Sequence, residues 1–379
     1  MMKNLLILLL VTCNVAHSQQ TITSSIMHDG LQRDYILYVP ANYTGSQNVP
    51  LLFNFHGYTS DATAQMYYGD FRPIADTAGF LIVHPQGKED GNGNTHFNVW
   101  GTTSIDDLGF TSALIDSLQL DYAIDEERVY STGMSNGGYM SFHLACKLSN
   151  RIAAIASVTG AMVPQTMSTC AASHPTAIMQ IHGTADPTVN YNGTAFASES
   201  VQSILNFWSG YNNTDVTAIT TNVPNTNTGD GCTAQRIEYL NGDACTEVVH
   251  YKIINGGHTW PGAPVTIGVT NHDFDASTEI WKFLSKYDIN GLRATCALSI
   301  ENIDEGHFNV YPNPSNKEII VKGEFLSEQS YELINTTGKR VAHGHLSDTK
   351  NTIDLSKLDS DVYFLKLNDQ TIRIVKTKN

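Results

Sequence analysis

Short apolar runs alternate with segments of helical length between residues 35 and 286. The runs are rich in β-branched and aromatic residues and most end at Gly or Pro, as strands do. We predict strands at residues 50–57, 79–87, 128–133, 152–160, 176–183 and 247–257, and helices at 109–120, 137–148, 199–210 and 276–287. Near-continuous apolar strands separated by helices are typical of a mostly parallel sheet covered on both faces. The predicted fold class is therefore α/β, with ligand sites at the carboxyl ends of the strands.

The alternation stops near residue 290, and the chain then changes character. Residues 290–307 follow neither pattern and are predicted to be a linker. Residues 308–379 contain short alternating strands with turn residues at regular spacing, which is typical of a small all-β sandwich. We therefore predict an α/β domain at residues 19–289 and a separate β-sandwich domain at residues 308–379.

The first 18 residues are predicted to be a signal peptide. Lys3 precedes an apolar run over residues 5–11, and Ala-His-Ser at 16–18 is a small-x-small cleavage site. The run is too short for a membrane span, which needs about 20 residues, and no later segment is apolar enough. A lipoprotein interpretation through Cys13 remains open, although Thr12 is a poor residue before a lipidated cysteine. We expect an exported protein without a membrane span.

Charge and motif content exclude several functional classes. The net charge is −15 with a pI near 5.3, which argues against nucleic acid and anionic membrane surfaces as partners. The histidines and cysteines lack metal-site spacing, and the chain has neither a phosphate-binding loop nor a dinucleotide fingerprint. We predict no cofactor and no metal.

Five cysteines remain after Cys13, so the exported protein can form at most two internal disulfides. Cys232 and Cys245 flank a segment that resembles a hairpin with an Asn-Gly turn, so this pair is the first prediction. Cys146–Cys170 is the second, which leaves Cys296 free in the linker. The alternative is that all thiols are free.

Ser135 lies in Gly-Met-Ser-Asn-Gly at 133–137, between a predicted strand and a predicted helix. In such a turn the G-x-S-x-G serine is held in a strained backbone conformation, and glycine is needed beside it because larger side chains would collide. The hydroxyl then projects at a helix N-terminus, where backbone amides face a developing oxyanion. We predict that Ser135 is a nucleophile; the alternative is a glycine-rich packing turn.

A serine hydroxyl needs a base to take its proton. In one large hydrolase class the chain order is serine, acid, histidine, with acid and histidine after later strands. Asp186 follows the strand that ends at His182, and His258 follows another strand after two glycines. We predict His258 as general base and Asp186 as the group that orients it, and we interpret His182 as a satisfied strand-end histidine. Other aspartates between serine and histidine remain alternatives: Asp215, Asp230 and Asp243.

The remaining predicted site residues surround this triad. The N–H of Asn136, directly after the serine, and the N–H of Tyr58, in the loop after an early strand, are the predicted oxyanion-hole donors. For Tyr58 an ordinary strand-exit turn is the alternative. Trp260, two residues after His258, and Trp100 are predicted to contact the substrate; packing is the alternative for both.

Several motifs in order carry a family resemblance: LFNFHGYTSD, DDLGFTSALID, DEERVYSTGMSNGGYMSFHLAC, IHGTADPTVNYNG and GGHTWPG. Over about residues 35–286 the chain resembles the secreted esterases that include polyhydroxybutyrate depolymerase-like proteins and feruloyl and acetylxylan esterases. The resemblance implies a cofactor-free α/β-hydrolase with the triad Ser135, Asp186 and His258. It also implies a disulfide at Cys146 and Cys170. Polymer-depolymerising relatives often have cysteine where this chain has Tyr58, which makes a polyester substrate less expected.

The C-terminal segments FNVYPNP, YELINTTGKRV, TIDLSKL and DVYFLKL resemble the sorting domain of type IX secretion. The resemblance implies export from the periplasm to the cell surface or medium by that machinery; a carbohydrate-binding sandwich is the alternative. We expect a secreted serine carboxylic-ester hydrolase that forms an acyl-enzyme, acting on plant polysaccharide that bears feruloyl or acetyl esters. The alternatives are a polyester depolymerase such as one for polyhydroxybutyrate, and a noncatalytic surface-binding protein.

Overall fold

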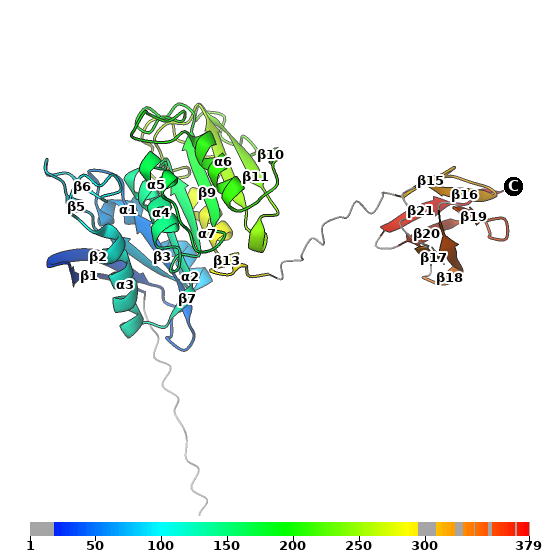
Figure 1. Ribbon diagram of the computed structural model, residues 1–379, viewed down its shortest axis with the longest axis horizontal. Coiled ribbons are helices and arrows are strands. Elements are labelled where there is room, and N and C mark those ends of the chain that lie inside the picture. The colour runs from blue at the N-terminus through cyan, green and yellow to red at the C-terminus, as the bar shows by residue number, and fades with distance from the viewer. Residues whose placement is uncertain are drawn as a thin grey trace, which may run out of the picture. The chain divides into compact units, whose positions relative to one another are not determined.

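The computed structural model describes residues 19–294, 308–322, 329–336, 338–347, 351–367 and 370–378. The chain divides into two compact units, residues 1–296 and 297–379, which we describe separately (Figure 1). The predicted signal peptide, residues 295–307 of the predicted linker and Cys296 lie outside the described residues.

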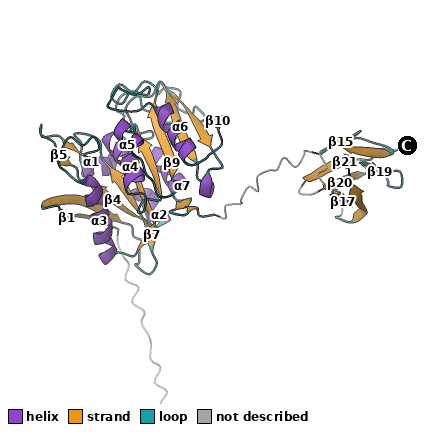
Figure 2. Cartoon of the chain, viewed as in Figure 1, coloured by secondary structure: helices purple, strands orange, loops and turns teal. Residues whose placement is uncertain are grey.

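A ten-stranded sheet forms the centre of the first unit (Figure 2). Six parallel strands lie in its middle, in the order β4 (Leu81–Pro85), β3 (Val49–Phe55), β7 (Ile124–Met134), β8 (Ala154–Val158), β9 (Ala177–Gly183) and β12 (Val248–Ile254). Antiparallel pairs complete both edges: β1 (Gln20–His28) with β2 (Leu31–Val39), and β11 (Thr233–Tyr239) with β10 (Ile219–Asn222). All six strands predicted from the sequence are present, and they are the six parallel ones.

Helices cover both faces of this sheet because its central strands are apolar on both sides. Along β3, Leu51 and Phe53 join one hydrophobic core, whereas Leu52 joins the other. The first core also takes side chains from α3 (Asp107–Asp121), α4 (Asn136–Lys147) and α6 (Val201–Tyr211). The second takes side chains from α2 (Arg72–Ala78) and α7 (Ala276–Leu284). This is the two-faced α/β architecture that the sequence predicts.

Short elements connect these layers. They are α1 (Ala62–Tyr68), β5 (Lys88–Glu89), β6 (Thr95–His96), α5 (Pro164–Ser168), the 3-10 turn η1 (Asp243–Cys245), β13 (Tyr287–Asp288) and β14 (Gly291–Leu292). The β13–β14 hairpin spans the predicted boundary at residue 290, with β13 before it and β14 inside the predicted linker. None of the helices in the described part of the chain has both the length and the hydrophobicity needed to span a bilayer.

The disulfide Cys146–Cys170 is present and ties α4 to the segment after α5. It closes a sequence separation of 24 residues, which on loop-entropy grounds stabilises the fold by about 3 kcal/mol. The predicted pair Cys232–Cys245 is wrong: Cys232 is a free buried thiol and Cys245 is disulfide-bonded. Cys232 directly precedes β11 and Cys245 lies beyond its other end. The strand therefore separates them by about 20 Å, whereas bridged Cα atoms lie within about 7 Å.

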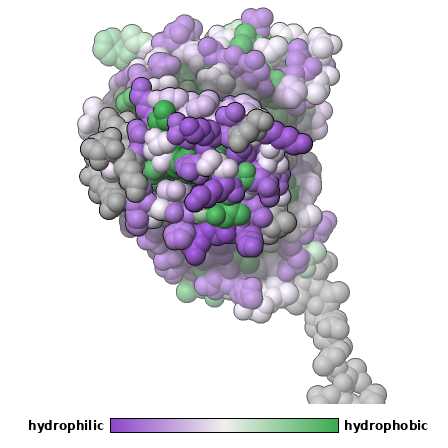
Figure 3. All heavy atoms as spheres, turned by 90° about the vertical axis from the view of Figure 1, so that its right-hand side faces the viewer, coloured by the Kyte–Doolittle hydropathy of each residue, from purple (hydrophilic) through white to green (hydrophobic). Residues whose placement is uncertain are grey.

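The second unit consists of two small sheets that share one core. One sheet has the order β15 (Asn309–Tyr311), β16 (Glu318–Lys322), β19 (Thr352–Asp354); the other has the order β18 (Arg340–Leu346), β17 (Gln329–Asn335), β20 (Val362–Leu367), β21 (Gln370–Val375). Ile319 of the first sheet and Leu333 and Leu365 of the second are fully buried in this core. The two-layer all-β arrangement agrees with the prediction. Hydrophobic residues are scattered among polar ones on the surface seen in Figure 3, which is normal for the surface of a folded protein.

Candidate active site

Ser135 lies between the last residue of β7 and the first residue of α4, with φ 53° and ψ −120°. Its N–H donates a hydrogen bond of 2.8 Å to the carbonyl of Val158 on the next strand. A non-glycine residue with such a φ is strained by about 1–3 kcal/mol and is typical of functional sites. The turn also needs glycine at 133, because a Cβ there would lie 2.6 Å from the Phe55 carbonyl oxygen. The local structure is therefore the strained strand-to-helix turn that the motif predicts.

His258 and Asp186 are joined by a hydrogen bond, with His258 Nδ1 2.8 Å from Asp186 Oδ2. The other carboxylate oxygen, Oδ1, accepts bonds of 2.8 Å from the N–H groups of Thr188 and Val189. Burial by itself would raise the pKa of Asp186. The hydrogen bond and charge of His258 and the hydrogen bond from the Val189 N–H outweigh burial, so the pKa of Asp186 lies below its usual value. The carboxylate is thus ionised at neutral pH, so His258 Nδ1 carries the donated proton and Nε2 is left with a lone pair.

Ser135 and His258 line the same pocket, which has a volume of about 720 Å³. The Asp186 side chain is fully buried behind the imidazole, whereas that of His258 is 18% exposed. The structure thus brings the predicted nucleophile and base to one cavity with the predicted acid behind the base. The other aspartates left open by the sequence accept hydrogen bonds elsewhere: Asp215 from Asn241, Asp230 from the His272 N–H and Asp243 from Asn213.

The loop after β3 borders the serine. Gly57 and Tyr58 line the pocket, and a Cβ on Gly57 would lie 3.4 Å from the Ser135 Cβ. His56 Nε2 accepts a hydrogen bond of 2.9 Å from the Gly87 N–H, so its Nδ1 carries the proton and donates to the Gly57 carbonyl at 2.7 Å. In a trans peptide the N–H points opposite to the C=O. His56 therefore fixes the peptide whose N–H, on Tyr58, is the predicted oxyanion donor.

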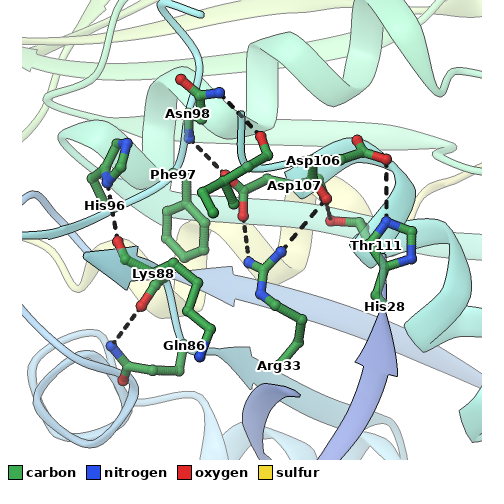
Figure 4. A network of polar contacts seen from close by, with 12 residues as sticks. His28, Arg33, Gln86, Lys88, His96, Phe97, Asn98, Asp106, Asp107 and Thr111 are labelled. Atoms are coloured by element: carbon green, nitrogen blue, oxygen red, sulfur yellow. Dashed lines mark hydrogen bonds and ion pairs between the residues drawn. The ribbon is translucent and has the colours of Figure 1, made fainter. Parts of the chain in front are cut away.

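Asn136, whose N–H is the second predicted donor, is the first residue of α4, and N–H groups there lack intrahelical acceptors. Its side chain accepts from the Phe97 N–H at 2.7 Å and donates to the Phe97 carbonyl at 3.0 Å. Figure 4 shows the anchor of this loop: Asp107 accepts from buried Arg33 and from the Asn98 N–H. The start of α4 and the loop after residue 96 are thus held together.

The two predicted substrate tryptophans differ in position. Trp100, 37% exposed, donates from Nε1 to the Ala197 carbonyl at 3.0 Å and packs 5.0 Å from the Tyr139 ring. Trp260 is fully buried: its Nε1 donates to Ser277 Oγ, and its ring packs edge-on against Phe71. The prediction that Trp260 contacts substrate is therefore wrong, because the core between β-sheet and α7 encloses the indole.

Sequence reasoning missed the apolar walls of the pocket. Tyr67 and Tyr68 come from α1, and Val265 and Ile267 come from the loop after Pro264. The full lining is Gly57, Tyr58, Ser60, Ala64, Gln65, Tyr67, Tyr68, Asp70, Met134, Ser135, His258, Pro264, Val265 and Ile267. Within the described ranges, no cluster of three or more His, Cys, Asp or Glu side chains is arranged to hold a metal ion.

Comparisons with known proteins agree with this geometry. Residues 106–226 match the family model Phospholipase/Carboxylesterase, and residues 309–378 match Secretion system C-terminal sorting domain. The first match lies in the α/β unit and the second in the C-terminal unit. The α/β-hydrolase fold and the carboxylic-ester hydrolase class predicted from the sequence are thereby supported, and the sorting domain supports secretion.

Relatives of the carboxylesterase domain include the bifunctional acetylxylan esterase/xylanase XynS20E of Neocallimastix patriciarum, 28% identical over 273 residues. That alignment covers 72% of this chain but 36% of the relative. The probable feruloyl esterase C of Aspergillus terreus is 28% identical over 272 residues, which cover 68% of this chain and 89% of that protein. Among solved structures, the acetyl xylan esterase from Aspergillus awamori is 16% identical with a TM-score of 0.47, covering 71% of this chain and 99% of that one.

Proposed function

We propose that this protein is a secreted serine carboxylic-ester hydrolase that forms an acyl-enzyme on Ser135. The observation that carries the proposal is that Ser135 and His258 line one pocket and that His258 is hydrogen-bonded to the buried Asp186 behind it. As Ser135 Oγ attacks the ester carbonyl carbon, His258 Nε2 takes the hydroxyl proton, and Asp186 stabilises the imidazolium. The N–H groups of Asn136 and Tyr58 bind the carbonyl oxygen as it becomes negative.

Collapse of this intermediate breaks the bond to the alcohol, which leaves with the proton from His258. Ser135 then carries the acyl group as an ester. Water loses a proton to His258 Nε2 as it attacks this ester, and the proton returns to Ser135 Oγ as the carboxylic acid departs. The triad geometry favours this chemistry over a noncatalytic binding role.

The favoured substrate is plant polysaccharide that bears feruloyl or acetyl esters. Relatives named feruloyl esterase and acetylxylan esterase support this class. The pocket favours the larger acyl group, because its volume of about 720 Å³ lies in the range of sites that enclose ligands of drug size. Tyr67, Tyr68 and Ile267 offer an aromatic and aliphatic wall for a phenylpropanoyl ring.

Trp100 supports contact with the sugar side of such a substrate. It packs on Tyr139, which lies one helical turn after Ser135 on α4, and it does not line the apolar pocket. A partly exposed indole at that position suits the face of a pyranose ring.

Hydrolysis of an apolar polyester is the second candidate. Hydrophobic side chains at the pocket mouth are well exposed, with Tyr67 at 55%, Val265 at 59% and Ile267 at 57%. Such a cluster is typical of a surface that meets an apolar partner. Purified protein offered methyl ferulate, acetylated xylan and polyhydroxybutyrate side by side, with products identified, separates the two candidates. The first proposal expects ferulate or acetate release to exceed release of hydroxybutyrate; the reverse order contradicts it.

We expect Ile267→Ala to lower kcat/KM for methyl ferulate by about 10-fold, because it removes apolar contact worth about 1–2 kcal/mol. Hydrolysis of p-nitrophenyl acetate should change far less, since acetate does not reach this wall. Val216→Ala is the matched control, because Val216 is 97% exposed and lies outside the pocket lining. Equal losses on both substrates would contradict the acyl-pocket assignment.

We further propose that residues 308–379 direct the protein to the type IX secretion machinery. The C-terminal unit has its own hydrophobic core, and the carboxylesterase pocket draws no residue from it. Deletion of residues 308–379 is therefore expected to retain the protein in the periplasm, measured by cell fractionation, with kcat/KM of the purified protein unchanged. Export of the shortened chain, or a collapse of its kcat/KM, would contradict this role. Full-length Ser135→Ala is the control and should still be exported.

A further inference from the structure

A second histidine lies behind the catalytic pair. His182 is in β9, four residues before Asp186, and its side chain is fully buried. Gln180 Nε2 donates to the Gly160 carbonyl at 2.8 Å, and the same nitrogen lies 2.9 Å from His182 Nδ1. An amide nitrogen only donates, so His182 Nδ1 is an acceptor and its proton resides on Nε2. Burial lowers the pKa of His182, which keeps this ring neutral.

The proton on His182 Nε2 points at the turn that carries Asp186. Nε2 lies 2.8 Å from the Val189 carbonyl and 3.5 Å from Asp186 Oδ2. The Val189 N–H donates to Asp186 Oδ1, so Val189 is fixed on one side by the carboxylate and on the other by His182. Asp186 Oδ2 is the oxygen that binds His258.

We infer that His182 is a positioning residue for Asp186: its Nε2–H holds the 186–189 turn so that Asp186 Oδ2 meets His258 Nδ1. The inference rests on the proposed function, because it concerns the same triad. A satisfied histidine that only fills the core would make the same contacts but leave catalysis unchanged when replaced by a residue of similar volume.

His250 supplies a matched control. It is equally buried, on the neighbouring strand β12, and bonds to the Gln180 carbonyl at 2.8 Å and to the Tyr191 hydroxyl at 2.9 Å. Tyr191 also packs against the His182 ring. The two histidines thus belong to one buried polar network, but His250 bonds to groups other than Asp186 and its turn.

The test compares His182→Leu, His182→Gln and His250→Gln on p-nitrophenyl acetate. His182→Leu removes the donor, and misplacement of a catalytic group by about 1 Å costs up to about 100-fold in rate. We expect its kcat to fall by about 10- to 100-fold with KM nearly unchanged. His182→Gln should recover most of this loss, because its amide nitrogen can donate to Val189. His250→Gln should keep kcat near the wild-type value even where its unfolding midpoint falls.

A spectroscopic signature accompanies the kinetics. The proton of His258 Nδ1 shared with Asp186 should give a low-field proton NMR signal in the wild-type protein and in His182→Gln, and this signal should shift or vanish in His182→Leu. The inference is overturned if His182→Leu retains kcat and the signal, or if kcat in all three variants follows only the unfolding midpoint. Failure of the proposed function is recognised separately, because Ser135→Ala would then remain active.

Discussion

Replacing Ser135 with alanine is expected to lower kcat for p-nitrophenyl acetate by about 10⁶-fold. The mutation removes the oxygen that forms the acyl-enzyme, so no covalent route remains. Residual hydrolysis would come only from the oxyanion donors and substrate binding. Stopped-flow absorbance should show the initial burst of p-nitrophenol in the wild-type protein and none in the variant.

The fold should tolerate this change. Alanine meets the same backbone strain at φ 53° as serine does, and the hydrogen bond from the residue 135 N–H to the Val158 carbonyl needs no side chain. The urea midpoint is therefore expected to stay at the wild-type value. A variant with normal folding and undiminished activity would remove Ser135 from the mechanism.

Asp186→Asn is expected to lower kcat by about 10⁴-fold. Asparagine has nearly the same shape as aspartate, but the surrounding hydrogen bonds determine which position the amide oxygen takes and which the NH₂ group takes. The N–H groups of Thr188 and Val189 both point at the Oδ1 position, so the amide oxygen occupies it and the NH₂ group faces His258. That NH₂ donates to Nδ1 and leaves the imidazole proton on Nε2, where a lone pair is needed to accept the Ser135 proton.

The measurement for Asp186→Asn is the pH profile of kcat with p-nitrophenyl acetate, beside the circular dichroism spectrum. Asp243→Asn is the matched control, because Asp243 also lies between serine and histidine in the chain but its carboxylate accepts from Asn213 and not from His258. Near-wild-type kcat in Asp186→Asn at neutral pH, with a large loss in Asp243→Asn, would show that the assignment of the acid role to Asp186 is wrong.

The sequence could predict where Ser135, Asp186 and His258 lie in the fold, because each position depends on local context. Ser135 lies at a strand-to-helix turn whose glycines are required by close backbone contacts. Asp186 and His258 each follow the end of an apolar strand, β9 and β12, which are neighbours in the sheet. Parallel strands bring their carboxyl ends to one edge, so the meeting of distant residues follows from the strand order.

Side-chain direction and strand length account for what the sequence could not predict. Trp260 is two residues from His258, but its indole is turned inward by packing on Phe71 and Ser277, which come from distant segments. The pairing Cys232–Cys245 fails because β11 runs between the two residues. The pocket walls at Tyr67 and Ile267 come from a short helix and a loop without periodic pattern.

The strand β1 was not predicted from the sequence, for a related reason. Its residues are mostly exposed and form no apolar run, so pairing with β2 rather than burial defines it. Edge strands of this kind carry little hydrophobic signal.

The most direct test of the central claim is covalent trapping with a p-nitrophenyl alkylphosphonate, which a serine nucleophile attacks to give a stable tetrahedral adduct. Mass spectrometry of the intact and digested protein reports the number of adducts and their position. The account predicts one adduct per chain on Ser135, formed in step with loss of activity, and none in Ser135→Ala. Complete inactivation with the adduct on another residue would contradict it.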